Sequence, residues 1–431
     1  MLNAIRPTQV TASPQGFWCR FQSIRANILS RPSLRGQLKG LVLLLLSSAL
    51  SGLCFTYLAS RRWRALDAEA VLFTVTYTQW VTLGVTLAKL GLDTYLFALV
   101  TADPRLRIDM HRFSLRYSAP ISIGMGLVLI PVFGLAPALL LSITVLSDSA
   151  SVLLSAQMTA LRHYSYPATA SLLKYPLFFL FLVCLSFITH LHALQVASVL
   201  CLGSLLRVAY LATRHLPPGE KVLDYKPSLW IAVHHPLNLV LFKADQLTLP
   251  LFGATAITIR FQQYAYLTKW PELVSGLTST VGVVFLPTLY CKVRDLQISL
   301  LQHKWIKWLL ILYAVGVCAA TFTYCIGFNG APPTRLVLPF SLAIALILPV
   351  NLGTYTLLRH SCLKVLIRNL ILSLLCGLFV CGTAWFTRSA LILSCAVPIQ
   401  LTVFLTLFLA KPPGTQTLSN VVAEADKAQT I

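Results

Sequence analysis

The strongest constraint on this chain is a series of apolar runs, each long enough to cross a lipid bilayer as a helix. About 20 apolar residues span a hydrocarbon core about 30 Å thick, and the backbone polar groups inside it must pair within the helix. The second and eighth runs exceed one straight span, and Gly91 and Pro271 are natural bend points. The twelve runs are 39–59, 70–100, 117–134, 136–160, 167–189, 192–213, 228–248, 254–290, 305–327, 334–357, 364–384 and 389–410.

The distribution of charge supports a membrane protein and predicts its orientation. Of the 431 residues, 57% are hydrophobic and 11% are charged, whereas soluble domains carry about a quarter charged residues. The net charge of +21 could suggest a nucleic-acid partner, but the basic residues gather in short loops between the runs. Loop lysines and arginines number 23 on one side of the predicted bilayer and 5 on the other. Both termini are therefore predicted to be cytoplasmic, with no nucleic acid bound.

Twelve spans with both termini on one side predict an all-α polytopic membrane protein. We expect a basic cytoplasmic tail (1–37), an N-terminal six-helix lobe (38–214), a cytoplasmic linker (215–227), a C-terminal six-helix lobe (228–410) and a second cytoplasmic tail (411–431). The segments DAEAVLFTVTYTQW and GATAITIRFQQYAYLTKW, near the starts of the second and eighth runs, resemble each other weakly. Many transporters are built from such repeats, with the substrate site between them.

Neither a metal, a cofactor nor a catalytic residue is predicted. The 11 cysteines form no CxxC pair and are best explained as small buried hydrophobic residues. No GxxxxGK[ST] motif is present, so ATP is not expected to be the direct energy source. The loops are short, which disfavours an enzyme, and a polytopic polysaccharide-assembly enzyme is the less favoured alternative.

Ten ionisable residues lie inside the runs: Lys89, Lys174, Arg207, Lys243, Arg260, Lys269, Asp93, Asp148, Asp245 and Glu272. Each costs about 2.5–3.5 kcal/mol on insertion scales and needs a partner or a water-filled path. At 100° per residue, several fall on polar helix faces that should point into the bundle. The three faces are Gln79, Thr82, Thr86, Lys89 and Asp93; Thr144, Asp148, Ser151, Ser155, Thr159 and Arg162; and His234, Asn238 and Asp245, with His235 and Gln246 at the edge.

Structural explanations compete with functional ones at these positions. Asp93 could cap the helical turn that follows Gly91. Asp148 could form a structural ion pair with Lys174 or Arg207. Lys243 and Asp245 are two residues apart, so on one helix they lie on nearly opposite faces. Lys243 should then reach a neighbouring helix or extend toward the outer interface. The two histidines, His234 and His235, could carry protons, although satisfied interfacial histidines are the favoured interpretation.

Three segments carry a family resemblance. They are AKLGLDTYLFALV (88–100), KADQLTLPLFGATAITIRFQQYAY (243–266) and PELVSGLTSTVGVVFLPTLYCK (271–292). They resemble motifs of the bacterial O-antigen (Wzx-type) flippases, in the superfamily that also contains multidrug antiporters and lipid-linked oligosaccharide exporters. In topology the resemblance covers nearly the whole chain after residue 38. It implies two six-helix lobes around a central cavity and flipping of an undecaprenyl-pyrophosphate-linked oligosaccharide across the bacterial inner membrane by alternating access.

The resemblance also implies roles for the buried charges. Cations would hold the anionic headgroup, because pyrophosphate binds Arg and Lys donors, and we expect Lys174, Arg207, Lys243 and Arg260 to do so. Cavity polar or ion-coupling residues would be Lys89, Asp93, Asp148, Asp245 and Asn238. Membrane lipids, a proton or sodium ion and the polysaccharide polymerase machinery are further candidate partners. The main alternative is a drug or metabolite antiporter of the same superfamily.

Overall fold

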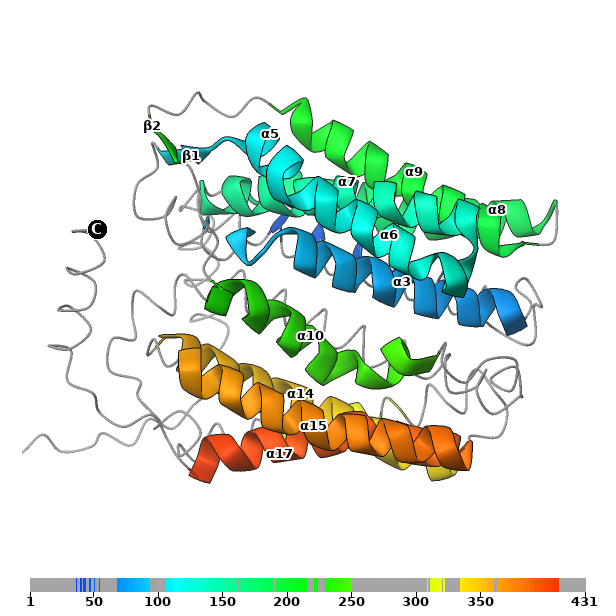
Figure 1. Cartoon of the computed structure of the whole chain (residues 1–431), viewed down its shortest axis with the longest axis vertical. Coiled ribbons are helices and arrows are strands. Elements are labelled where there is room, and N and C mark those ends of the chain that lie inside the picture. The colour runs from blue at the N-terminus through cyan, green and yellow to red at the C-terminus, as the bar shows by residue number, and fades with distance from the viewer. Residues whose placement is uncertain are drawn as a thin grey trace, which may run out of the picture.

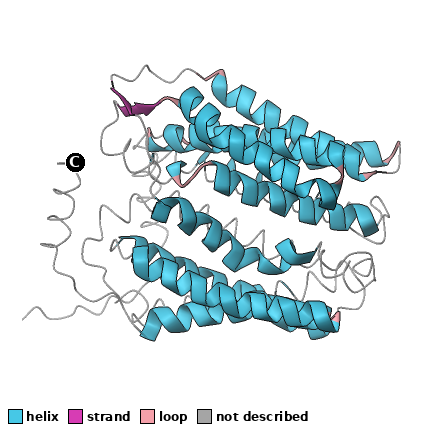
Figure 2. Cartoon of the chain, in the orientation of Figure 1, coloured by secondary structure: helices cyan, strands magenta, loops and turns pink. Residues whose placement is uncertain are grey.

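The computed structural model is almost entirely helical (Figure 2). It describes residues 68–93, 106–161, 163–188, 191–214, 221–223, 229–249, 311–319, 334–359 and 363–410, with isolated positions between 36 and 54 and at 96, 308 and 321. The predicted all-α class is confirmed, apart from two three-residue strands. The elements are α3 (Ala68–Ala88), β1 (Leu106–Ile108), α5 (Met110–Phe113), the π-helix η1 (Ser114–Ser118), α6 (Ala119–Phe133), α7 (Leu135–Ala160), α8 (Ser165–Ser186), α9 (Ala193–Ala212), β2 (Lys221–Leu223), α10 (Leu229–Thr248), α14 (Thr334–Arg359), α15 (Leu363–Thr387), α16 (Ala390–Ser394) and α17 (Ala396–Ala410).

Within the described residues, six helical stretches are long and apolar enough to cross a membrane. They are Met110–Phe133, Leu135–Ala160, Ser165–Ser186, Ala193–Ala212, Lys364–Thr387 and Ala390–Ala410. The protein is therefore a multi-pass membrane protein. Five of these stretches match the predicted runs closely, whereas Met110–Phe133 begins seven residues before the predicted run 117–134. The predicted runs 39–59, 254–290 and 305–327 lie wholly or mostly outside the described residues.

The described helices form two packed groups that meet along α3 and α10 (Figure 1). We call α3 and α5–α9 the N-terminal group, and α10 and α14–α17 the C-terminal group. In the N-terminal group, α7 packs against α3, α6 and α9, and α9 also packs against α8. In the C-terminal group, α15 packs against α10 and α17, and α14 packs against α17. The groups fall on either side of the predicted linker at 215–227.

The predicted bend at Gly91 is confirmed. Helix α3 ends at Ala88, and Leu90 and Gly91 follow with φ angles of 48° and 72°. Glycine adopts this left-handed conformation readily, whereas it costs leucine about 1–2 kcal/mol. The break deprives the Ala88 carbonyl of its helical partner, because the Leu92 amide donates to Lys89 instead. The Ser118 hydroxyl donates to that carbonyl at 2.9 Å, which anchors the end of α3 to the start of α6.

A second break, in α10, was not predicted. Lys243 has φ −138° and ψ 15°, so two helical segments meet at this residue. The rule of 100° per residue does not run through such a break. Helical spacing therefore does not establish that His234 and Asn238, which precede the break, share a face with Asp245, which follows it.

The two short strands connect loops that lie on the predicted cytoplasmic side. β1 follows α3, and β2 lies in the linker between the two groups (Figure 1). They pair in parallel, with Leu106 opposite Lys221 and Ile108 opposite Leu223. The sequence predicted only loops here, because three residues are too few for an alternating pattern to be recognised.

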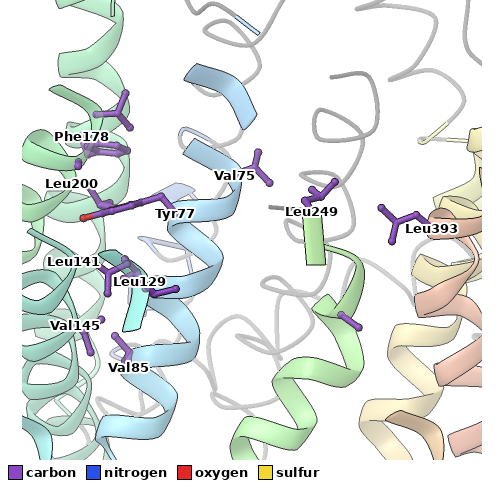
Figure 3. Packing of buried hydrophobic residues seen from close by; sticks show 14 of the residues in the cluster. Val75, Tyr77, Val85, Leu129, Leu141, Val145, Phe178, Leu200, Leu249 and Leu393 are labelled. Atoms are coloured by element: carbon purple, nitrogen blue, oxygen red, sulfur yellow. The ribbon is translucent and has the colours of Figure 1, made fainter. Parts of the chain in front are cut away.

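The largest apolar cluster extends from the N-terminal group into the C-terminal group. Around α3 it contains Val75, Tyr77, Leu141 and Val145, and it reaches Leu249 and Leu393 on the other side (Figure 3). Tyr77 is fully buried, and its hydroxyl donates to the Pro137 carbonyl at 3.2 Å. A second cluster lies inside the C-terminal group and joins Leu241 of α10 to Leu366, Leu370, Leu401 and Phe404.

Helix α3 presents different faces to the two groups. Tyr77 and Gly84 lie two turns apart on the face that packs against α7. The Tyr77 hydroxyl donates to the Pro137 carbonyl of α7. Gly84 lets the two helices approach closely, since a Cβ there would lie 2.7 Å from Val145. The polar positions Gln79, Thr82 and Thr86 lie on the opposite face, at 100° per residue. Because α10 covers α3 on the side away from α7 (Figure 1), the predicted polar face of α3 turns toward the C-terminal group.

The close approach of α6 and α7 depends on Gly126. A Cβ at this position would lie 1.9 Å from Ser142 Oγ and 2.9 Å from the Ala138 carbonyl oxygen. We expect Gly126→Ala to lower the free energy of unfolding by about 1–3 kcal/mol, because the backbone of α7 must move away. Thermal unfolding in detergent micelles measures this loss.

Gly124 of the same helix provides a matched control. Nothing lies within 4 Å of a Cβ added there, so Gly124→Ala should leave stability unchanged or raise it slightly, because alanine favours helix over glycine by about 0.5–1 kcal/mol. Equal unfolding temperatures for the two variants would contradict the tight crossing at Gly126.

Candidate functional site

Three helices of the N-terminal group bring a carboxylate and two cations together. Asp148 lies on α7, Lys174 on α8 and Arg207 on α9. Lys174 Nζ donates to Asp148 Oδ2, and Arg207 Nη1 lies 4.0 Å from Asp148 Oδ1. Asp148 and Lys174 are 2% and 1% exposed, whereas the Arg207 side chain is 12% exposed. We call these three residues the Asp148 cluster.

Small and hydroxyl-bearing residues make room for the Asp148 cluster. Gly203 lies one turn before Arg207, and a Cβ there would lie 3.4 Å from the Lys174 carbonyl oxygen, which brings α8 and α9 close together. On α7 the Ser151 hydroxyl donates to the Asp148 carbonyl at 2.9 Å, so it is satisfied within its own helix. The Ser151 hydroxyl therefore does not compete for the Asp148 carboxylate.

The Asp148 cluster leaves one positive charge in excess. Lys174 and Asp148 neutralise each other, because a buried carboxylate and ammonium in contact offset much of the cost of removing them from water. Arg207 is different: 4.0 Å is too long for a hydrogen bond. Its Nε has no hydrogen-bond partner among the described residues. The guanidinium is thus the partly exposed member of the cluster with donor capacity remaining.

A second ionisable cluster lies where the two groups meet. Lys89 Nζ contacts Asp93 Oδ2 at 2.5 Å, and His235 Nε2 of α10 lies 4.0 Å from Asp93 Oδ1. The side chains of Lys89 and Asp93 are 13% and 17% exposed. Asp93 therefore pairs within its own segment across the break at Gly91, and also faces the C-terminal group. We call Lys89, Asp93 and His235 the Asp93 cluster.

The other predicted site residues lie on α10, away from the three helices that carry the Asp148 cluster, or outside the described residues. Asp245 is buried, and its Oδ1 accepts a hydrogen bond from the backbone N–H of Gln246 at 2.8 Å. Lys243 and Asn238 are partly buried on the same helix. Arg260 lies outside the described residues, as does the predicted run 254–290. The headgroup and coupling roles expected for all these residues stay predictions.

His235 has a partner that its position in the sequence does not indicate. Helical spacing places it at the edge of the α10 polar face, where an interfacial histidine is the favoured interpretation. Spacing could have pointed to it, because His235 lies three residues before Asn238, and both precede the break at Lys243, so they share one face of the first segment of α10.

Buried amides in the C-terminal group were also not singled out. Gln400 of α17 and Asn369 of α15 are fully buried. Neither side-chain amide atom of Gln400 has a hydrogen-bond partner among the described residues, and the side chain lies across Gly377 of α15. Within the same residues no group of three or more His, Cys, Asp and Glu side chains is placed to hold a metal ion.

The pairing of Asp148 with Lys174 generates a stability prediction. Lys174→Met should lower the free energy of unfolding by about 3–5 kcal/mol, because it leaves a buried carboxylate with only the distant Arg207 as counter-charge. Adding Asp148→Asn should recover part of this loss, with a coupling of about 0.5–3 kcal/mol. Thermal unfolding of both single variants and the double variant in detergent micelles measures the coupling.

Lys364→Met serves as the control, since Lys364 is exposed on α15 and its loss should change stability by about 0.5 kcal/mol or less. A double variant whose loss equals the sum of the two single losses would contradict a direct interaction between Asp148 and Lys174.

The arrangement of helices is similar to that of a known transporter. No protein-family model and no curated protein matches the sequence. Among solved structures, the chain is similar to the crystal structure of the eukaryotic MATE transporter AtDTX14, with a TM-score of 0.50 and 12% sequence identity. The match covers 88% of this chain and 95% of that chain. At this identity the likeness shows the fold alone: the chain has the fold of a MATE transporter.

Proposed function

We propose that this protein is a membrane transporter that works by alternating access between the N-terminal and C-terminal groups. The observation that carries the proposal is the buried Asp148 cluster within a MATE transporter fold. Ionisable residues inside a membrane are costly, and where they are retained they commonly mark substrate or ion pathways. The fold of the neighbour supports transport over an enzymatic activity.

The excess charge of the Asp148 cluster suits an anionic group of the substrate. Lys174 is engaged by Asp148, so Arg207 is the cation that we assign to the substrate. A guanidinium binds a phosphate oxygen pair through two parallel hydrogen bonds, and it stays charged at any physiological pH. Lys174 then acts as a positioning residue: it makes the hydrogen-bonded ion pair with Asp148, so Arg207 does not have to.

The substrate that we propose is an undecaprenyl-pyrophosphate-linked oligosaccharide, flipped across the bacterial inner membrane by a protein with both termini in the cytoplasm. The pyrophosphate matches Arg207, and the three segments that resemble O-antigen flippases support this substrate class. Lys243 and Arg260 would add cationic contacts. Asp245 would carry a coupling proton or sodium ion, and the polysaccharide polymerase machinery would receive the product. On α3, Thr82 and Thr86 donate to carbonyls of their own helix at 2.7 Å, which leaves their oxygens able to accept from sugar hydroxyls.

A drug or metabolite antiporter is the second candidate, and the fold match to a MATE transporter favours it. A cationic drug would need an available carboxylate. Asp148 already bonds Lys174, and Asp93 already bonds Lys89. Both acids are therefore partly neutralised, which favours the anionic substrate over the cationic one.

Transport by purified protein in proteoliposomes tests the proposal. We expect labelled undecaprenyl-pyrophosphate oligosaccharide to move between leaflets, and Arg207→Ala to slow this movement about tenfold or more, because a hydrogen bond to a charged group is worth about 1.5–3 kcal/mol. Arg207→Lys should retain part of the rate, since an ammonium keeps the charge and loses the paired donors.

Arg214→Ala is the matched control, because Arg214 is exposed just beyond the end of α9 and lies over the ring of Tyr210. Its rate should equal that of the parent. Exchange of cationic drugs against protons by folded protein, with no movement of the lipid-linked sugar, would overturn the flippase and establish the antiporter.

A further inference from the structure

The helical stretch Met110–Phe133 continues past the apolar run that predicted it. The run begins at residue 117, whereas the helix begins at Met110. The added segment, formed by α5 and η1, reads MHRFSLRYS and contains two arginines and no acid. It lies at the predicted cytoplasmic end of the stretch. A basic helix that extends a membrane span in this way places its charges at the level of the lipid headgroups.

The π-helical turn η1 decides which side of this segment faces the protein. The backbone N–H of Ala119 donates to the Ser114 carbonyl, five residues earlier, so residues five apart lie on nearly the same side. Phe113 and Ser118 are five apart, and both are buried. On a regular α-helix they would lie about 140° apart. Phe113 packs into an apolar cluster beyond the end of α3, and the Ser118 hydroxyl anchors that end.

With its apolar side turned inward, the segment leaves its arginines on the outside. Arg112 and Arg116 are four residues apart, and both side chains are exposed. Leu115 is 62% exposed between them. The Arg116 guanidinium lies over the ring of Tyr117, with its carbon 5.4 Å from the ring centroid. Arginine, tyrosine and leucine on one outer face are typical of a helix surface that contacts a membrane interface.

The positive charge of Arg112 and Arg116 is not balanced by acids of the described residues, because neither arginine takes part in an ion pair there. Asp109, which precedes them in the chain, accepts a hydrogen bond from the backbone N–H of Arg112 at 3.0 Å and so caps α5. Like charges one turn apart on a helix repel each other. An anion bound between the two guanidinium groups would replace this repulsion with attraction.

We propose that Arg112, Arg116 and Tyr117 form a binding surface for the phosphate of an anionic phospholipid, in the leaflet at the predicted cytoplasmic end. A guanidinium binds phosphate oxygens through parallel hydrogen bonds, and a tyrosine ring favours the level of the headgroups. Because Ser118 of the same turn bonds to the last residue of α3, lipid binding here anchors the adjoining ends of α3 and α6 at the membrane surface. The surface does not depend on which substrate is carried.

The apolar side chains next to the two arginines favour a lipid over a soluble anion. Leu115 is exposed between them, and the same side of the helix continues along α6 with Ile123 and Leu127, which are 57% and 60% exposed. These side chains extend from the arginines into the span and would contact acyl chains. A phospholipid satisfies both parts of this surface at once, whereas a free phosphate satisfies only the arginines.

Local fluorescence quenching on the full chain in phosphatidylcholine nanodiscs tests the surface. A fluorophore is attached at His111→Cys, an exposed position beside Arg112, in a background where the 11 cysteines are replaced. A minor fraction of lipid, spin-labelled near its headgroup, acts as the quencher. Half-maximal quenching should need at least about fivefold less labelled phosphatidylglycerol than labelled phosphatidylcholine, because each basic residue near a membrane surface favours anionic lipid by about that factor.

Charge variants distinguish a phosphate-binding surface from general contact with lipid. Arg112→Gln combined with Arg116→Gln should make the two labelled lipids quench equally. Arg112→Lys combined with Arg116→Lys should retain part of the preference, since the charge stays and the paired donors are lost. Lys364→Gln removes an exposed cation of the other group and is the matched control, which should quench as the parent does. Added salt should reduce the preference of the parent.

Three results would overturn the proposal. The first is equal quenching by both lipids in the parent. The second is a preference for phosphatidylglycerol that persists in the double glutamine variant. The third is loss of the parent's preference when inorganic phosphate replaces chloride at constant ionic strength, which would assign the arginines to a soluble anion. Because the readout is local lipid binding, the result stands whether or not the lipid-linked sugar is transported.

Discussion

The cost of holding charge inside a bilayer governs how these helices are arranged. Asp148 and Lys174 lie deep within spans that contain mostly apolar side chains, and both are buried. They meet across α7 and α8, and Arg207 of α9 completes the cluster. Three helices are thereby placed relative to one another by an electrostatic requirement, and apolar packing around Val145 and Leu200 fills the remaining space.

The same requirement explains which helices lie between the two groups. α3 and α10 carry threonine, glutamine, asparagine and histidine residues, and the two helices lie side by side (Figure 1). The more apolar helices α6, α8, α15 and α17 place large side chains such as Leu127, Leu180 and Phe379 on the outside. The proposed alternating access needs this division, because a polar interface can exchange protein contacts for water, whereas an apolar interface resists separation.

The limits of sequence-based inference follow from particular residues. Helix boundaries were predicted well, since α7 at Leu135–Ala160 and α10 at Leu229–Thr248 occupy runs defined by hydropathy alone. Gly91 was recognised because glycine tolerates a left-handed backbone, although the adjacent Leu90 adopts one as well. The break at Lys243 has no such local signal. His235 was undervalued because its importance comes from Asp93, which lies 142 positions earlier in the chain.

The sequence by itself determined that this chain crosses a membrane many times, where most of its spans begin and end, and which residues are too polar to face lipid. Those properties follow from hydropathy and helical period, which are local along the chain. Only the tertiary structure decided that Lys174 rather than Arg207 makes the hydrogen-bonded pair with Asp148, and that Asp93 faces both Lys89 and His235. Such choices depend on how helices distant in sequence approach one another. Period and composition identify a polar face, but the neighbouring helices determine its partner.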